Sequence, residues 1–559
     1  MLEQQSFHLE SREVRLAASL TMPVNGVRRL LLVAPPLVEE RKAALPAVVE
    51  MSRQLAEAIG VAVLRVDYPG TGDSEGDFAD FGPEDWIASL ADAADWLRER
   101  FGMLPFAGLG IRTGAALLAS CQSDFLRNAP KVLWDPVSGE EAVKQWLQRH
   151  MVNDMVAYGK ARVSRAALET ALAGGGSADL DGFELTGAQY AGLLSLGLGD
   201  AASRTLAVVS GRPSAATAKW AEANAAQVEL RPLRTPPYWN SVGYVDTAEL
   251  RDATAAWLGD VLGGRGDARP SPVAATRDPS RLSLGEGAEC FVSFESGGAT
   301  VRGVLTLPEG EVRRTILFLG GWSGDRQGPH RLFLLLARRQ AGRGTASLRI
   351  DYRGRGESDG RHADATISTM ADDAERAVAW LRGQGLLPHG LDVVAICSGC
   401  KVAIALATRA EVRHMDLLSA EAMGSLRAKG TNAAKSASAL RTYIRKLFRR
   451  ETWRKIFRGE VRTDMVGKAL VRHETRGAAE AKAEDAVLAL FRSYRGNLLF
   501  VYGGSDPDAP GARAGYGRFC RRNALSASFE EIPNAGHSYY ALDWTERLFT
   551  ILGANSREI

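Results

Sequence analysis

The segment Arg65-Val-Asp-Tyr-Pro-Gly-Thr-Gly-Asp-Ser-Glu-Gly76 recurs later in the chain as Arg349-Ile-Asp-Tyr-Arg-Gly-Arg-Gly-Glu-Ser-Asp-Gly360. The two copies lie 284 residues apart, counted from Arg65 to Arg349, and Trp96 and Trp380 keep the same separation. A repeat of this kind predicts two related domains in tandem. It also allows a comparison of the copies position by position, so that what one half retains and the other has lost is visible in a single sequence.

The composition is typical of a globular chain with two sizeable cores. The chain has 559 residues, of which 45% are hydrophobic and 24% are charged, and its formal net charge of +3 argues against a nucleic-acid partner. The first eleven residues lack the features of a secretion signal, and no apolar run is long enough to span a membrane. Five cysteines in so long a chain do not form a disulfide scaffold. We therefore expect a cytoplasmic protein.

Each half alternates apolar, β-rich runs with amphipathic helices, beginning at residues 30–34 and 315–319. This order predicts an α/β fold in which each half has a mostly parallel, doubly wound sheet. Between the halves, residues 263–279 are rich in Gly, Pro and charge and have no apolar period, as in a linker. We place the domains at 1–262 and 286–559, with a linker at 263–285.

The second half contains a strand-to-helix turn that predicts a nucleophile. The strand at 391–396 runs into Cys397-Ser-Gly-Cys-Lys401. A nucleophile elbow needs small residues two positions before and two after the nucleophile, and Ala395 and Gly399 satisfy this need around Cys397. Centring the turn on Ser398 would place Ile396 and Cys400 at the crowded positions. The pattern favours Cys397 as nucleophile and keeps Ser398 as the alternative.

Other interpretations of Cys397 are a buried structural thiol and a Cys-x-x-Cys redox or metal pair with Cys400. Its place at the amino end of a helix stabilises a thiolate, which favours a reactive role. A zinc site would need two further close ligands, and the sequence has no second Cys-x-x-Cys and no spaced His pair. We expect no metal and no cofactor.

An acid and a histidine follow Cys397 in the order that an elbow nucleophile requires. Asp506 follows an apolar strand, with Asp508 as the alternative acid, and His537 follows the next strand. Either residue alone would be an ordinary loop residue. The joint order predicts a Cys397-His537-Asp506 triad. We expect the oxyanion donors to be the backbone amides of Ser398 and Trp322, the latter in the glycine-rich loop 320–324.

The first half lacks all three catalytic roles. Arg112 stands at the turn where the second half has Cys397, and neither His8 nor His150 lies near the strand that would carry the histidine. The strand at 206–213 has no carboxylate at the position of Asp506. The first domain is therefore predicted to be a pseudo-hydrolase. Arg112 either binds a ligand carboxylate or phosphate or forms an ion pair with Glu39 or Glu40.

The second half also carries about seventy-five residues more than one crossover requires. We expect a cap at about 420–495 over the carboxyl ends of the strands. Within it, residues 441–458 interleave basic and apolar side chains, as in a basic amphipathic helix. Such a helix would contact an anionic substrate, an acidic acyl-carrier partner or a membrane surface, or would simply pack as a lid.

These motifs resemble two α/β-hydrolase families associated with exosortase A systems in bacterial exopolysaccharide gene clusters, here fused. The second half resembles the family with a cysteine elbow, through residues 351–358 and Cys397. The first half resembles the other family, through residues 35–40, the arginine elbow at 110–114 and residues 134–140. The resemblance implies hydrolase or acyl-transfer chemistry and names no substrate.

Two functional hypotheses follow. In the first, Cys397 attacks an ester or thioester, and the enzyme is an esterase, a thioesterase or an acyltransferase, according to whether water or another acceptor takes the acyl group. In the second, the protein is a non-catalytic scaffold that binds a ligand in the first-domain cleft through Arg112.

Overall fold

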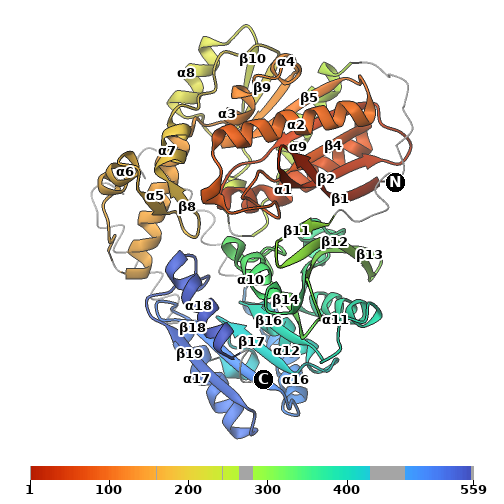
Figure 1. Cartoon of the computed structure of the whole chain (residues 1–559), viewed down its shortest axis with the longest axis vertical. Helices are drawn as coiled ribbons and strands as arrows, with labels where there is room; N and C mark the ends of the chain where they lie inside the picture. The colour runs from red at the N-terminus through yellow and green to blue at the C-terminus, as the bar shows by residue number, and fades with distance from the viewer. Residues whose placement is uncertain (1, 159, 242, 264–280, 428–472, 556–559) are drawn as a thin grey trace.

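The computed structural model describes residues 2–158, 160–241, 243–263, 281–427 and 473–555. The two halves of the chain form two separate sheets, with the first half above the second in Figure 1. Among the described residues, no helix has the length and apolar character needed to cross a bilayer.

The first sheet has eight strands in the order β1-β2-β4-β3-β5-β6-β9-β10. The N-terminal hairpin pairs antiparallel and joins β4 antiparallel, whereas the pairs from β4 to β10 are parallel. The strands are β1 (Leu2–Ser11), β2 (Val14–Pro23), β3 (Arg29–Ala34), β4 (Val61–Val66), β5 (Phe106–Ile111), β6 (Lys131–Trp134), β9 (Thr205–Ser210) and β10 (Val228–Leu233).

The second sheet repeats this order as β12-β13-β15-β14-β16-β17-β18-β19, with a short β11 added at its edge. The predicted fold of two mostly parallel sheets is confirmed. The second sheet begins at Leu282, inside the span assigned to the linker. Its strands are β11 (Leu282–Ser283), β12 (Gly287–Ser296), β13 (Ala299–Pro308), β14 (Arg314–Leu319), β15 (Thr345–Asp351), β16 (Asp392–Ile396), β17 (His414–Leu418), β18 (Asn497–Gly503) and β19 (Ala527–Ile532).

Helices cover both faces of each sheet, because alternate side chains of a strand point to opposite faces. In β3, Leu30 and Leu32 join one buried cluster, while Leu31 and Val33 join another. The helices of the first half are α1 (Glu39–Ile59), α2 (Pro83–Phe101), α3 (Thr113–Ser120), α4 (Asp124–Asn128), α8 (Ala215–Ala223) and α9 (Ala248–Val261). Those of the second are α10 (Leu332–Ala341), α11 (Ile367–Gly383), α12 (Gly399–Leu406), α17 (Ala509–Arg522) and α18 (Leu542–Asn555).

Both halves carry an insertion between corresponding strands. In the first half the insertion between β6 and β9 comprises α5 (Gly139–Tyr158), α6 (Arg165–Ala173), β7 (Ser177–Asp179), β8 (Glu184–Thr186) and α7 (Gly187–Leu194). In the second half, the described part of the insertion between β17 and β18 includes α16 (His473–Phe491). The basic segment 441–458 lies outside the described residues.

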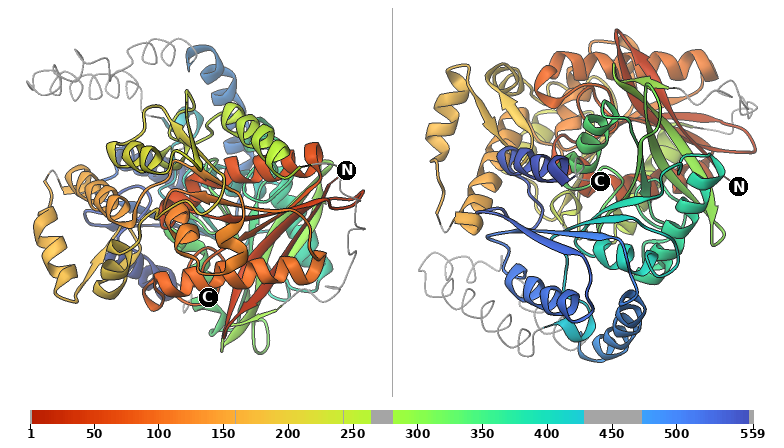
Figure 2. Two further views of the ribbon diagram at one scale, coloured as in Figure 1. Left: turned by 90° about the horizontal axis from the view of Figure 1, so that it is seen from above. Right: turned by 60° about the horizontal axis from the view of Figure 1, so that its bottom comes forward.

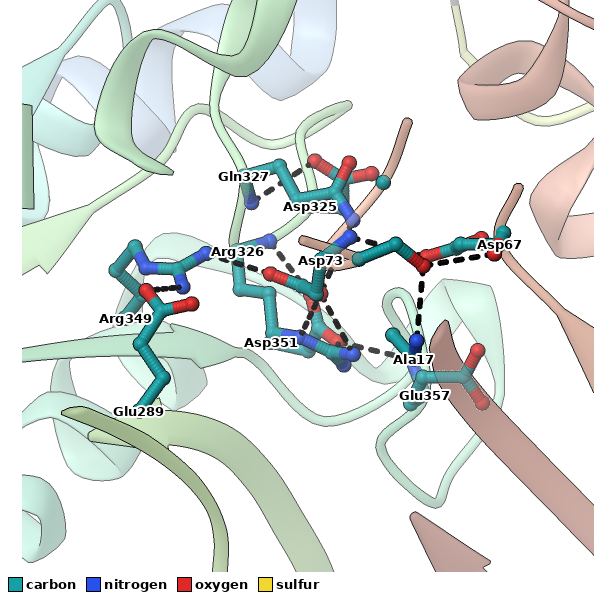
Figure 3. A network of polar contacts seen from close by, with 12 residues as sticks. Ala17, Asp67, Asp73, Glu289, Asp325, Arg326, Gln327, Arg349, Asp351 and Glu357 are labelled. Carbon is teal, nitrogen blue, oxygen red and sulfur yellow. Dashed lines mark hydrogen bonds and ion pairs between the residues drawn. The ribbon is translucent and has the colours of Figure 1, made fainter. Parts of the chain in front are cut away.

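The repeated segments face each other across the boundary between the domains and exchange ion pairs. Arg65 of the first copy forms two hydrogen bonds of 2.7 Å with Glu357 of the second. In return, Arg349 of the second copy pairs with Asp73 of the first at 2.7 Å. Arg65 corresponds to Arg349 and Asp73 to Glu357 at the repeat's offset of 284 residues, so the contacts are reciprocal. Figure 3 shows the network around Asp73.

Two further arginines repeat this reciprocity. Arg53, on α1, donates to the backbone oxygen atoms of Glu357 and Ser358 at 3.0 and 3.1 Å. Arg338, on α10, donates to those of Asp73 and Ser74, both at 3.1 Å. The N-terminal hairpins also meet: the rings of His8 and Phe291 are 4.8 Å apart, and β1 and β12 lie side by side in Figure 2. The duplicated motif therefore forms the core of the interface between the domains.

The interface pairs are buried, so breaking one leaves a charge without its partner. The side chains of Arg65 and Glu357 are only 8% and 6% exposed, and although burial alone would raise the pKa of Glu357, the neighbouring arginines, chiefly Arg65, lower it to about 2. We expect Arg65→Met to lower the free energy of unfolding by about 3–5 kcal/mol in urea denaturation.

The matched control is Arg339→Met, which breaks an exposed pair with Glu546 and is expected to cost less than about 1 kcal/mol. The double variant Arg65→Met/Glu357→Gln should regain part of the loss, because it leaves no unpaired carboxylate. A loss below about 1 kcal/mol for Arg65→Met would contradict the structural role of the pair.

Candidate active site

The turn between β16 and α12 has the strained geometry that was predicted for a nucleophile elbow. The backbone of Cys397 has a φ of +58°, a value that residues other than glycine rarely adopt. A Cβ atom on Gly399 would lie 2.2 Å from the backbone oxygen of Leu319, so only glycine fits two positions after the tip. Cys397 stands at the tip and lines a cavity.

Ser398 and Cys400 are placed differently from Cys397. Ser398 is 3% exposed, and its Oγ accepts a hydrogen bond of 2.9 Å from the backbone amide of Trp322. Cys400 is fully buried, where burial raises the pKa of its thiol well above the ordinary value. Of these three residues, Cys397 is the one that lines the cavity.

The structure brings His537 and Asp506 together beside Cys397. Nδ1 of His537 lies 2.8 Å from Oδ2 of Asp506, which is 4% exposed. His537 also interacts with the side chain of Cys397. Since Nδ1 faces the carboxylate, Nε2 is the nitrogen available to the thiol. The alternative acid, Asp508, is exposed, and its backbone amide donates to Asp506.

The two neighbours of His537 determine its charge. Burial alone would lower the pKa of His537, but the hydrogen bond to Asp506 and the interaction with Cys397 outweigh burial and raise the pKa to about 10. His537 is therefore protonated at neutral pH. A protonated imidazole at this position holds a proton for a leaving group.

The sequence did not reveal a second pair of charges next to the thiol. Sγ of Cys397 lies 3.4 Å from a carboxylate oxygen of Glu421, and Nζ of Lys401 lies 3.0 Å from the other oxygen of that group. Lys401 also pairs with Glu484 of α16 at 3.0 Å. The lysine offsets the carboxylates, so Glu421 is not an isolated negative charge beside the thiol of Cys397.

The loop after β14 differs in one respect from the prediction. The Trp322 amide, predicted to be an oxyanion donor, instead donates to the hydroxyl of Ser398. The neighbouring Gly321 is the residue that faces the thiol, because a Cβ atom there would lie 3.4 Å from the Cβ of Cys397. Nε of Arg355 donates to the backbone oxygen of Trp322 and holds this loop.

In the first domain, Arg112 keeps the strained backbone of the elbow, with a φ of +53°, but not its chemistry. Its Nε lies 3.1 Å from Glu40, its other nitrogens contact Gln145 and the backbone oxygen of Asp135, and it stacks on Trp239. The side chain is 4% exposed. The structure shows the ion pair with Glu40, which was one of the two interpretations of Arg112.

The cavity over Cys397 has a volume of about 440 Å³ and is shared by the two domains. The second domain contributes Cys397, His537 and the loops that carry Trp322 and Arg355. The first domain contributes residues of α1 and of the segment 241–244. The indole of Trp322 packs against Gly243 of the first domain. A Cβ atom added to Gly243 would lie only 2.8 Å from the indole ring.

The insertion of the first domain also contacts the loops that carry the acid and the histidine. Ser505, next to Asp506, donates to the backbone oxygen of Ala157 at 2.7 Å. Tyr540, three residues after His537, donates to that of Asn153 at 3.1 Å. The first domain thus helps to position the site of the second.

The comparison between the two halves also contained the signal for the residues that were missed. At the offset of 284, Arg355 replaces Thr71 and Glu421 replaces Val137. Glu421 introduces a charge beside Cys397, and Arg355 introduces one in the lining of the same cavity. No group of three or more metal-ligating side chains occurs in the part of the chain that the structure describes.

Comparisons with known proteins agree with this architecture. Residues 316–549 match a family model described as the alpha/beta hydrolase family. No curated protein matches the chain. The strand order and the strained turn give both halves the fold of α/β-hydrolases, and the family match lies within the second half.

Solved structures similar to the chain include Est1E from Butyrivibrio proteoclasticus with bound ferulic acid (15% identity, TM-score 0.34, 48% of this chain and 98% of that one). Others are a dienelactone hydrolase from Anabaena variabilis (16%, 0.33, 48% and 95%) and an alpha-beta serine hydrolase homologue from Coxiella burnetii (13%, 0.32, 49% and 99%).

The raised pKa of His537 predicts the effect of removing its carboxylate partner. In Asp506→Asn we expect this pKa to fall from about 10 by at least about one unit, because the hydrogen bond to an anion is lost. Carbon-13 NMR of histidine-labelled protein measures it, with the signal assigned through His537→Gln and the exposed His389 as internal reference.

The same shift affects stability. The pKa of His537 is raised in the folded state, so protonated His537 adds to the free energy of unfolding. This stabilisation is fully present below about pH 6.5 and is lost as the pH rises through about 10. An unchanged titration of His537 in Asp506→Asn would contradict the assignment of Asp506 as its partner.

Proposed function

We propose that the second domain is an enzyme that cleaves an ester or thioester through an acyl intermediate on Cys397. The observation that carries this proposal is the joint placement of Cys397, His537 and Asp506, in the order and at the strand ends that an elbow nucleophile requires. A thiolate is a soft nucleophile and a good leaving group, which favours thioesters and activated esters over amides.

The reaction has two halves. The thiolate of Cys397 attacks the carbonyl carbon, and the bond from that carbon to the alcohol oxygen or thiol sulfur breaks while His537 gives its proton to the leaving group. Water or another hydroxyl or thiol then attacks the acyl-cysteine and gives its proton to His537. This second half releases the acyl product and restores the thiolate.

The choice between hydrolysis and transfer depends on the acceptor that reaches the acyl-cysteine. On the resemblance to exosortase-associated hydrolases alone, we propose that the reaction belongs to exopolysaccharide-linked metabolism. A carrier-bound acyl group is a suitable donor, with the basic segment 441–458 as the proposed contact for an acidic carrier or a membrane surface.

Labelling tests the nucleophile directly. An activated ester such as a p-nitrophenyl ester should add one acyl group to the wild-type protein, as measured by intact mass. The adduct should be lost in Cys397→Ala and kept in Ser398→Ala, and turnover should fall about 10⁴-fold or more in Cys397→Ala. The half-buried Cys290 provides the matched control, Cys290→Ala, which should retain the label.

Two results would contradict this proposal in different ways. An adduct that survives in Cys397→Ala but is lost in Ser398→Ala would assign the nucleophile to Ser398. The absence of any adduct in the wild-type protein would favour the scaffold hypothesis instead.

A further inference from the structure

Arg355 is a buried arginine that lines the cavity over Cys397, and within the described part of the chain it has no carboxylate partner. It is 7% exposed. Its Nε donates to the backbone oxygen of Trp322, and its Nη1 to those of Gly354 and His362 at 3.0 and 2.9 Å. Among the described residues, its Nη2 makes no hydrogen bond, and the guanidinium forms no ion pair.

The neighbouring arginines are different. Arg353, two residues earlier, pairs with Asp373, and Arg53, which lines the same cavity, pairs with Asp359 at 3.3 Å. Of the two arginines that line the cavity, Arg355 is the one that only neutral carbonyl groups contact. The buried Arg331 is also held by backbone oxygen atoms alone, but its Nε, Nη1 and Nη2 are all engaged and it does not line the cavity.

An unpaired buried charge is costly unless an opposite charge approaches it. Burial lowers the pKa of Arg355 to about 10, and no nearby acid raises it, so the group remains charged at neutral pH. The adjacent His362 adds no positive charge at neutral pH, because burial and the Arg355 guanidinium lower the pKa of His362 to about 4.

The other charged groups of the cavity are mostly paired. Glu39 lies 3.1 Å from His330, and Glu50 lies 3.4 Å from Arg251. Lys42, on α1 of the first domain, donates to the backbone oxygen of Gly328 at 3.0 Å. Its acidic neighbours are Glu39 and Asp325, which offset part of its charge. Arg355 is thus the principal uncompensated cation, with Lys42 as a weaker one from the other domain.

We propose that Arg355 binds a carboxylate or phosphate group of the substrate, and that Lys42 of the first domain contributes to the same anion site. This inference rests on the proposed function and narrows it to acyl donors that carry a negative charge. It also gives the degenerate first domain a part in substrate binding. A guanidinium is well suited to such oxygen anions, and hydrogen bonds to charged groups are roughly twice as strong as neutral ones.

The test compares thioesters of equal length that end in a carboxylate, a phosphate or a neutral methyl ester. The measured quantity is the ratio of kcat/KM for each anionic thioester to that for the neutral one. We expect this ratio to fall roughly 10- to 100-fold in Arg355→Gln and roughly 3- to 10-fold in Lys42→Gln. The control Arg361→Gln changes an 85% exposed arginine on the same loop, outside the cavity lining, and should leave the ratio unchanged.

The ratio of kcat/KM values distinguishes binding of the substrate anion by Arg355 from a purely structural role of Arg355 in holding the loops. If Arg355 only holds the loops of Trp322 and His362, then Arg355→Gln lowers kcat/KM for all three thioesters equally, and the inference is overturned. A fall confined to the carboxylate or to the phosphate identifies which group the site accepts.

A second readout needs no turnover. Succinate or inorganic phosphate should slow the alkylation of Cys397 by iodoacetamide in the wild-type protein but not in Arg355→Gln. Protection without ester labelling would retain the anion site and reject the proposed enzyme. Labelling without protection, together with an unchanged ratio, would retain the enzyme and reject the anion site.

Discussion

The reciprocal ion pairs of Arg65 with Glu357 and of Arg349 with Asp73 join the two domains. These charges are buried and satisfied only when the two domains meet in one orientation, because each guanidinium must reach the carboxylate of the other copy. The same orientation places α1 and Gly243 of the first domain over the loop of Trp322. The cavity above Cys397 is therefore a product of the interface, and neither domain forms it alone.

The duplication is symmetric in backbone and asymmetric in chemistry. Both elbows retain a strained left-handed residue, and both keep a glycine two positions later that packs against the first parallel strand of its sheet. In the second domain the tip is a thiol beside a histidine and an aspartate. In the first domain it is Arg112, held by Glu40 in the interior. The first domain has kept the scaffold and uses it to complete the site of its neighbour, through contacts near Trp322, Asp506 and His537.

Local sequence rules were sufficient to predict much of this molecule. Apolar periodicity and the repeat predicted both sheets, and the steric rule for small residues around a sharp turn predicted that Cys397, rather than Ser398, stands at its tip. Chain order predicted the pairing of Asp506 with His537. The repeated segment predicted the two related domains but not the pairing between its copies, in which Arg65 and Arg349 reach Glu357 and Asp73 of the other domain. Such pairing depends on tertiary placement, as does the hydrogen bond that engages the Trp322 amide. A comparison of which positions gain a charge in one half would have identified Arg355 and Glu421.

We propose that this chain, whose two halves share the α/β-hydrolase fold, has a single covalent catalyst, in the second domain. The most direct measurement is a rapid-quench experiment with a thioester, followed by proteolysis and mass spectrometry of the acylated peptide. We predict a burst of one acyl group per chain, carried by the peptide that contains Cys397 and attached to its sulfur. A second acyl group on the first domain, or an acyl group on any residue other than Cys397, would contradict the account.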